Sequence, residues 1–135
     1  LDKDTSGLLL VTNDGHFAHK VIHPSANIHK EYVATVDGPI TKDHLYAISQ
    51  GTHVEETFVK PRLVEKINPT TLKIVVSEGK KREVRILINN AQLEVTALER
   101  TRIGNLALDP SLKPGQWRPM TEKEKQLIFE KDIRK

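Results

Sequence analysis

Apolar residues along the chain recur mainly with the two-residue period of a β-strand. In residues 71–77, Leu72, Ile74 and Val76 alternate with Lys73 and Val75. This alternation places the first three side chains on one face of a strand. Short apolar runs bounded by turn residues predict further strands. The predicted strands are residues 7–12, 31–36, 59–67, 71–77 and 93–103, with 105–108 extending the last and Pro61 indicating an edge or a bulge in the third.

A second set of segments repeats apolar residues every three or four positions, which is the period of an α-helix. Most of these segments begin with a residue whose side chain caps helices. The predicted helices begin at Asn13 or Asp14 and end before Pro24, run from Thr41 through Ser49, cover 82–89, and begin at Thr121 with Glu124 completing a capping box. Short helices in mixed order with more numerous strands predict an α+β fold on a mixed, mostly antiparallel sheet.

Length and composition are those of one globular domain with a polar surface. The chain has 135 residues, of which 37% are hydrophobic and 29% charged. It contains no Cys, which excludes a disulfide framework and a thiolate zinc site. No apolar run approaches the roughly 20 residues that span a bilayer. These features are compatible with a reducing cytosol.

Basic residues gather at two places, although the net charge is only +3. Basic clusters beside apolar segments fit contacts with phosphates, which supply most of the affinity for nucleic acids. A solvated basic helix face is the alternative for the first cluster. The clustered residues are Lys80, Lys81, Arg82 and Arg85, followed by Arg100 and Arg102.

Three histidines, His16, His19 and His23, stand at helical spacing, an arrangement that can hold a metal ion. The chain has no H-E-x-x-H motif, and Pro24 cuts the predicted helix short. An exposed polar helix face is therefore the favoured interpretation, and no metal site is predicted.

The first fifteen residues, LDKDTSGLLLVTNDG, carry the most specific chemistry of the chain. They place the carboxylates of Asp2 and Asp4 on a Gly-containing loop directly before a predicted strand. A carboxylate on a loop that is held by a rigid strand suits a nucleophile or an acid–base group. An exposed acidic turn before a core strand is the plainer interpretation of such a pattern.

This segment resembles the signature of the ribosomal RNA pseudouridine synthases of the RsuA and RluB/E/F type, whose Asp after Leu is the catalytic nucleophile. The resemblance assigns that role to Asp2, with Asp4 as its rival. The family motif normally reads G-R-L-D, whereas this chain begins at the Leu. We therefore expect residues 1–135 to be a catalytic domain without the upstream strands and the small RNA-binding domain of the family.

Three further segments resemble the family in the same order. Lys30-Glu31-Tyr32 matches a K-x-Y segment whose Tyr stacks on the target uracil and is a candidate proton acceptor. Residues 78–85, EGKKREVR, resemble a segment whose last basic residue, here Arg85, pairs with the catalytic carboxylate. Residues 98–121 resemble the C-terminal pattern of the family, which we interpret mainly as fold.

Each assigned residue also has a plainer interpretation. A strand Tyr is usually a core residue, and Arg85 alone fits the surface of a basic helix. A guanidinium beside Asp2 has a physical use, since it keeps the carboxylate ionised and fixes its orientation. The chain departs from the family at Ile86-Leu87, where a basic residue and Met are usual, and at Gln92, where Gly is usual. Both departures concern RNA affinity more than the chemistry.

The resemblance implies the pseudouridine synthase catalytic fold and the isomerisation of a specific uridine in ribosomal RNA to pseudouridine, without a metal or an organic cofactor. The implied partner is ribosomal RNA or a ribosomal subunit precursor, bound by a monomer with no membrane contact. The implied location is the bacterial cytoplasm, or an organelle where a targeting segment lies upstream. The alternative function is a non-catalytic module for rRNA binding or ribosome assembly. The predicted catalytic residues are Asp2, Tyr32 and Arg85, and the predicted RNA-binding residues are Lys80, Lys81, Arg82, Arg100 and Arg102.

Overall fold

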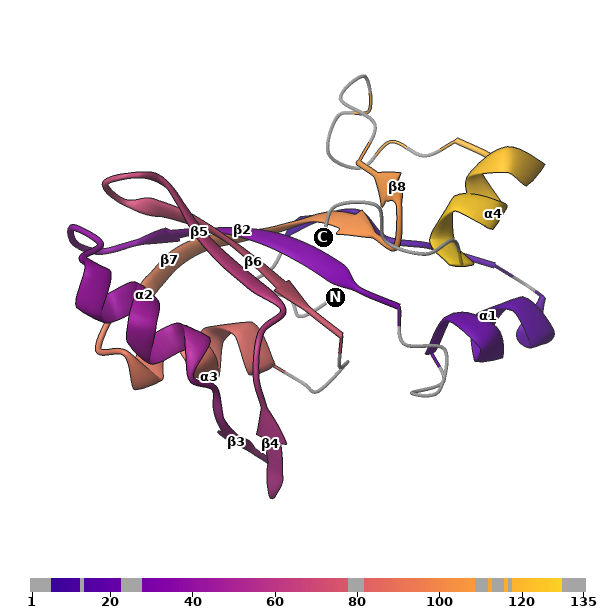
Figure 1. Cartoon of the computed structure of the whole chain (residues 1–135). Helices are drawn as coiled ribbons and strands as arrows, with labels where there is room; N and C mark the ends of the chain where they lie inside the picture. Colours follow the sequence, from indigo (N-terminus) through magenta and orange to yellow (C-terminus); the bar gives the residue numbers. More distant parts are fainter. Residues whose placement is uncertain are drawn as a thin grey trace.

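The computed structural model describes residues 6–12, 14–22, 28–77, 82–108, 112, 116 and 118–129, without the side chains of 16, 19, 21 and 22. The helices within these residues are α1 (Gly15–Ile22), α2 (Lys42–Ser49), α3 (Glu83–Asn90) and α4 (Glu122–Phe129). The strands are β1 (Ser6–Gly7), β2 (Lys30–Val36), β3 (Thr52–Val54), β4 (Thr57–Val59), β5 (Leu63–Asn68), β6 (Thr71–Val76), β7 (Val95–Ile103) and β8 (Leu106–Ala107) (Figure 1).

Most of the strands form one sheet in the order β1-β7-β2-β6-β5, with β8 paired to β7. All pairs in this sheet are antiparallel except the parallel pair of β1 and β7. In Figure 1, α2 and α3 lie together on one side of the sheet, whereas α1 and α4 lie at its other end, with α4 near β8. The predicted α+β class with a mixed, mostly antiparallel sheet is confirmed.

The main core lies between the sheet and the helices α2 and α3. Its β6 residues are those of the predicted alternation, and its α3 residues recur every three or four positions, as predicted for 82–89. Packing therefore follows the hydrophobic pattern of these segments directly. The shared cluster includes Ala34, Val36, Leu72, Ile74 and Val76 from the sheet and Val84, Leu87 and Ile88 from α3.

Side chains cap the helices α1, α2 and α4 as predicted. At α2, Thr41 Oγ1 accepts from the His44 N–H at 3.2 Å, and His44 Nδ1 accepts from the Thr41 N–H at 3.0 Å. Thr121 and Glu124 exchange equivalent bonds of 3.0 and 3.1 Å at α4. At α1, the Asp14 carboxylate accepts from an N–H of the first turn at 3.2 Å. Each bond satisfies a donor that the helix itself leaves open.

The predicted buried strand over residues 7–12 is wrong in extent. Ladder pairing is limited to β1, and the residues after it alternate between the interior and water. Leu8 and Leu10 pack against an apolar cluster, whereas Leu9 and Val11 are 56% and 84% exposed. The apolar run therefore lies at an edge of the sheet and not inside it, and one face of the run is exposed to solvent.

The predicted single strand over 59–67 is two strands. Pro61 lies between β4 and β5, and it lacks the N–H that a continuous ladder would need. β3 and β4 form a separate hairpin that projects from the main sheet (Figure 1). The sequence does not predict this hairpin, because its turn residues are Glu55 and Glu56, at φ 50° and 68°, where Asn and Gly are usual.

Residues 105–108 do not extend β7, contrary to expectation. The chain turns at Gly104, which has φ +58°, and β8 then returns antiparallel to β7. A β-carbon at Gly104 would stand 2.2 Å from the Ile128 carbonyl oxygen, so α4 packs directly on this turn. A second apolar cluster forms here from Ile28, Ile103, Leu106 and Ile128.

Candidate active site

A row of three residues crosses the sheet where the predicted catalytic tyrosine lies. Tyr32 of β2 is directly opposite Arg100 of β7, and Arg100 is directly opposite Gly7 of β1. In the sequence, β1 closely follows the segment that contains Asp2. The topology thus brings the end of the N-terminal motif and the tyrosine of the second motif to opposite sides of one strand.

A β-bulge in β7 adjoins this row. Glu31 and Tyr32 are consecutive on β2, whereas their partners on β7 are two residues apart. Arg100 is opposite Tyr32, Arg102 is opposite Glu31, and Thr101 between them is the extra residue of the bulge. Consecutive strand residues point to opposite faces, and directly opposite residues share a face. Arg100 therefore shares the face of Tyr32, and Arg102 points to the other face.

The main chain of Leu8 is held by Arg100 through two hydrogen bonds. The Leu8 N–H donates to the Arg100 carbonyl oxygen at 2.8 Å, and Arg100 Nε donates to the Leu8 carbonyl oxygen at 2.8 Å in a half-buried position. The same arginine is paired with Tyr32 across the strands, and its guanidinium acts on the Tyr32 hydroxyl. This link between β1 and the tyrosine has no signal in the sequence, where Arg100 is interpreted as a phosphate contact.

The hydroxyl of Tyr32 is the titrating group that these contacts affect most. Its burial raises the pKa of Tyr32 above the ordinary value, the charge and hydrogen bond of Arg100 oppose this rise, and the charge of Glu83 adds to it. The net rise leaves Tyr32 a neutral phenol at neutral pH. A neutral, partly buried ring suits stacking on a base better than it suits immediate proton removal.

Helix α3, which carries the third predicted catalytic residue, packs against the same core as Tyr32. Tyr32 packs against the core cluster to which α3 contributes. Glu83, the first residue of α3, is 4% exposed, and its charge acts on the Tyr32 hydroxyl. Arg85 follows two residues later and is half-buried. Arg82 is exposed and precedes the helix with a left-handed φ of 58°. The buried carboxylate of Glu83 is a site feature that the sequence analysis does not predict.

Three predicted site residues, Asp2, Lys80 and Lys81, lie outside the described residues, as does the rival carboxylate Asp4. The pairing of Asp2 with Arg85 and the phosphate contacts of the two lysines therefore stay predictions.

Arg102 lies in a polar cluster on the face of the sheet opposite Tyr32. Arg102 Nε is 3.9 Å from Glu31 Oε2, and Arg102 Nη1 donates to the Asn105 carbonyl oxygen at 3.2 Å. Thr101 Oγ1 donates to Glu31 Oε1 at 2.8 Å. Glu31 is 8% exposed, so these contacts compensate a buried carboxylate. Arg100 and Arg102 thus do not form one basic patch.

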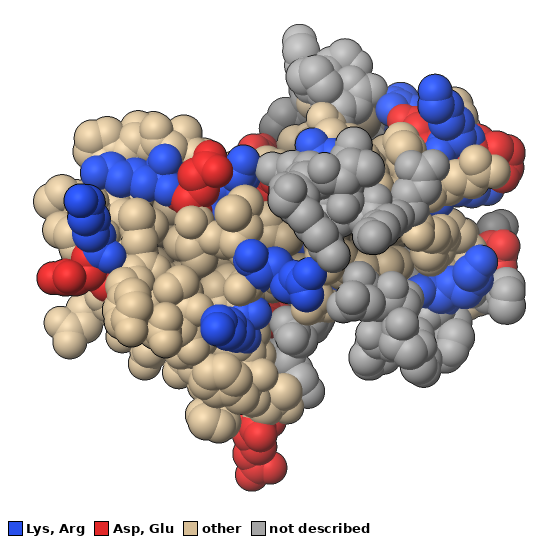
Figure 2. Space-filling model, viewed as in Figure 1, with Lys and Arg blue, Asp and Glu red and all other residues tan. Residues whose placement is uncertain are grey.

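Figure 2 shows small basic and acidic groups on this face of the molecule, several of them side by side, and no large patch of one charge among the coloured residues. Within residues 6–129 as far as they are described, no group of three or more His, Cys, Asp or Glu side chains could hold a metal ion. The side chains of His16, His19 and His23 are outside this set. The described helices include none that is long and apolar enough to cross a membrane.

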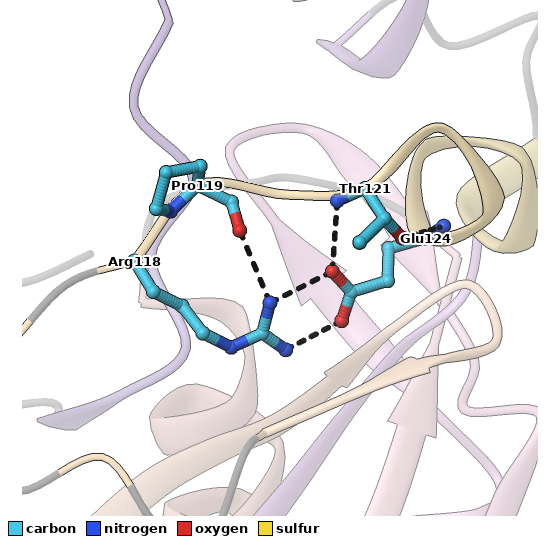
Figure 3. A network of polar contacts seen from close by, with 4 residues as sticks. All are labelled: Arg118, Pro119, Thr121 and Glu124. Atoms are coloured by element: carbon cyan, nitrogen blue, oxygen red, sulfur yellow. Dashed lines mark hydrogen bonds and ion pairs between the residues drawn. The ribbon is translucent and has the colours of Figure 1, made fainter.

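Residues of the C-terminal motif form a hydrogen-bond network that holds the segment before α4 against the first turn of that helix (Figure 3). Arg118 donates to both carboxylate oxygens of Glu124, at 2.8 and 2.5 Å, and to the Pro119 carbonyl oxygen at 3.1 Å. The hydrogen bond from Arg118 and then that from the Thr121 N–H lower the pKa of Glu124 to about 2. These contacts join the main chain of residues 119 and 121 to the start of α4. They agree with the interpretation that this motif has mainly a structural role.

The fold and the order of the motifs agree with a comparison against protein families. Residues 1–90 match the family model described as RNA pseudouridylate synthase, and the chain belongs to this family. The family resemblance seen in the sequence is thereby confirmed.

Individual relatives support the same assignment. The chain is 49% identical over 122 residues to the putative ribosomal large subunit pseudouridine synthase SVR1 of Arabidopsis thaliana, a chloroplastic protein, covering 86% of this chain and 30% of that one. It is 36% identical over 126 residues to ribosomal small subunit pseudouridine synthase A of Escherichia coli K12, covering 92% and 54%. A crystal structure of a pseudouridylate synthase matches with a TM-score of 0.89 at 31% identity, covering 95% and 56%. The chain thus spans about half or less of the length of these proteins.

Proposed function

We propose that this chain carries the catalytic domain of an enzyme that converts a uridine of ribosomal RNA into pseudouridine. The observation that carries the proposal is the row of Gly7, Arg100 and Tyr32. In a member of this family, that row sets the strand after the Asp2 motif beside the tyrosine of the second motif. The two curated relatives named above are both ribosomal pseudouridine synthases, which supports ribosomal RNA as the substrate class.

The reaction breaks the bond between N1 of uracil and C1′ of ribose, turns the base and joins C5 to C1′, after which C5 loses a proton and N1 carries one. Asp2 is the proposed nucleophile, and two routes are open to its carboxylate. It attacks either C1′, with the base as leaving group, or C6 of the uracil. Either adduct keeps one half of the nucleotide attached while the base turns, which is the use of covalent catalysis here.

Tyr32 and Arg85 support this chemistry in different ways. The target nucleotide must leave its stack at a cost of a few kcal/mol, and stacking on the Tyr32 ring offsets part of that cost. Arg85 is the proposed partner of Asp2. Its charge keeps the carboxylate ionised and therefore nucleophilic at neutral pH.

RNA phosphates are proposed to meet the basic segment before α3, where Lys80, Lys81 and Arg82 are consecutive. Such contacts position the RNA without reading its sequence. The relatives come from a bacterium and a chloroplast, so we place the protein with ribosomes in a bacterial cytoplasm or an organelle.

The test is tritium release from ribosomal RNA transcripts that carry uridine labelled at C5. C5 loses its hydrogen only when it becomes the glycosidic carbon, so release reports the isomerisation itself. We expect release by the full-length protein, none by the Asp2→Asn variant, and near-normal release by the matched Asp4→Asn variant. Release by Asp2→Asn would move the nucleophile elsewhere. No release by the parent, on naked RNA and on ribosomal subunits alike, would favour the non-catalytic RNA-binding module.

A further inference from the structure

Arg100 joins two parts of the proposed site that are distant in the sequence, the end of the N-terminal motif at Leu8 and the ring of Tyr32. We propose that Arg100 is a positioning residue of this site, which holds the Leu8 main chain at a fixed distance from the Tyr32 ring and does not bind RNA phosphates. This inference rests on the pseudouridine synthase function proposed above. It differs from the sequence-based prediction that Arg100 is a phosphate contact.

The first argument is that β1 depends on Arg100 for its place. In the described part of the chain, β1 has two ladder pairs with β7, Ser6 with Glu99 and Gly7 with Arg100. Beyond them, the Leu8 main chain is held by the two 2.8 Å hydrogen bonds of Arg100. A two-residue strand with so few bonds has little order of its own, so the side-chain bond from Arg100 Nε acts together with the packing of Leu8 to orient it.

The second argument is the direction of the side chain. The bulge at Thr101 turns Arg100 to the face of Tyr32 and leaves Arg102 on the other face. Bulges near active sites commonly re-aim one side chain in this way. A phosphate-binding arginine would keep its guanidinium in water. Arg100 is instead half-buried, and its Nε donates a hydrogen bond to the Leu8 carbonyl oxygen.

The third argument concerns the type of residue. Arg100 Nε donates to Leu8 while the guanidinium also acts on Tyr32, its partner on β2. A planar group with several fixed donors can serve both neighbours. Arg has five such donors in a rigid fork, whereas Lys presents a compact point charge. Replacing Arg100 by Lys therefore keeps the positive charge that a phosphate contact would need, but removes the planar set of donors that holds Leu8.

The experiment compares Arg100→Lys and Arg100→Met with the parent in the full-length protein. The matched control is Arg62→Met, because Arg62 is exposed and precedes β5 at the far edge of the sheet. Three quantities are measured: the single-turnover rate at saturating RNA, the Kd for RNA with its salt dependence, and hydrogen exchange of peptides covering residues 6–12 and 71–77.

We expect both Arg100 variants to lose about 10- to 100-fold in rate, because a small displacement in the site has effects of this size. The Kd and its salt slope should stay close to those of the parent. Exchange should speed up about tenfold in residues 6–12 and stay unchanged in 71–77, since only local order is lost. The Arg62→Met protein should match the parent in all three measurements.

Two results would overturn the inference. A weaker Kd with a salt slope reduced by about one in Arg100→Met, at an unchanged rate and with normal values for Arg100→Lys, would make Arg100 a phosphate contact. Faster exchange over both peptides would make it a general fold residue. An inactive parent would instead refute the proposed function, and the exchange data would still show whether Arg100 orders Leu8.

Discussion

Gly7 approaches the main chain of Arg100 so closely that a β-carbon at Gly7 would stand 2.2 Å from the Arg100 carbonyl oxygen. Gly7 also has φ +105°, a conformation that residues with a side chain rarely adopt. The parallel pairing of β1 with β7 therefore requires a glycine at this position. Through it, the N-terminal motif is attached to the strand that also contacts Tyr32.

The substitution Gly7→Ala should lower the free energy of unfolding by about 2 kcal/mol, because it adds backbone strain and a clash with main chain that has no room to move. Urea unfolding of both proteins measures the difference. The control is Gly38→Ala, where an added β-carbon meets nothing within 4 Å. Equal effects of the two substitutions would show that the approach of β1 to β7 does not need Gly7.

The turn of the β3–β4 hairpin should be easy to stabilise. Glu55 and Glu56 occupy it with φ 50° and 68°, a conformation that Asn and Gly adopt at lower cost, and their like charges are adjacent. Replacing the pair by Asn-Gly should raise the stability by about 1 kcal/mol. Thermal unfolding checks this, with Glu94→Asn as a control for the loss of an exposed charge outside the turn. A lower Tm of the Asn-Gly protein would show that the glutamates make contacts worth more than the strain.

The parts of the fold that the sequence predicts are those whose apolar residues recur with a regular period. β2, β6, α2 and α3 have this pattern, and their alternation or stripe reflects which side chains form the main core. The helix caps are likewise predictable, because Thr41 and Thr121 satisfy local donors by short-range bonds. The same reasoning fails at Leu9 and Val11, whose apolar side chains are exposed on an edge that local patterns do not identify.

Long-range pairing explains what the sequence leaves open in the site. The tyrosine and the basic helix are suggested by motifs, but the bulge at Thr101 arises from how β7 pairs with β2, which no local pattern of residues encodes. That bulge reverses the expected grouping of Arg100 with Arg102, since residues two apart on a regular strand share a face. The position of Arg100 beside Leu8 depends on a parallel pair of strands more than ninety residues apart in the chain.

Acid should weaken the start of α4 in a defined range of pH. The folded-state pKa of Glu124 is about 2, lowered from 4.5 mainly by Arg118. A carboxyl whose pKa is lowered by folding contributes stability above its unfolded pKa and loses it as the pH falls toward the folded pKa. The contribution should therefore be complete above pH 4.5 and disappear as the pH falls to about 2.

The Glu124→Gln variant tests this directly. Its Tm should be below that of the parent at neutral pH, and the difference should shrink steadily between pH 4.5 and 2. Glu122→Gln is the control, since Glu122 is also in the first turn of α4 but its side chain is 84% exposed. A Tm difference for Glu124→Gln that does not change over this range would mean that the Arg118 pair is not the source of the stabilisation.

The extra residue of the bulge, Thr101, donates from Oγ1 to the buried carboxylate of Glu31 at 2.8 Å. Thr101→Val keeps the shape of the side chain and removes this bond, which leaves a buried charge with one donor fewer. The loss should be about 1–3 kcal/mol in the free energy of unfolding, whereas Thr101→Ser should retain most of the stability. The control is Thr96→Val, which removes a 3.2 Å bond to the Thr35 carbonyl oxygen at an exposed position and should cost no more than about 0.5 kcal/mol. If Thr101→Val and Thr96→Val are equally mild, the Thr101 bond does little to compensate the buried charge of Glu31, and the nearby Arg102 guanidinium is left as its main compensation.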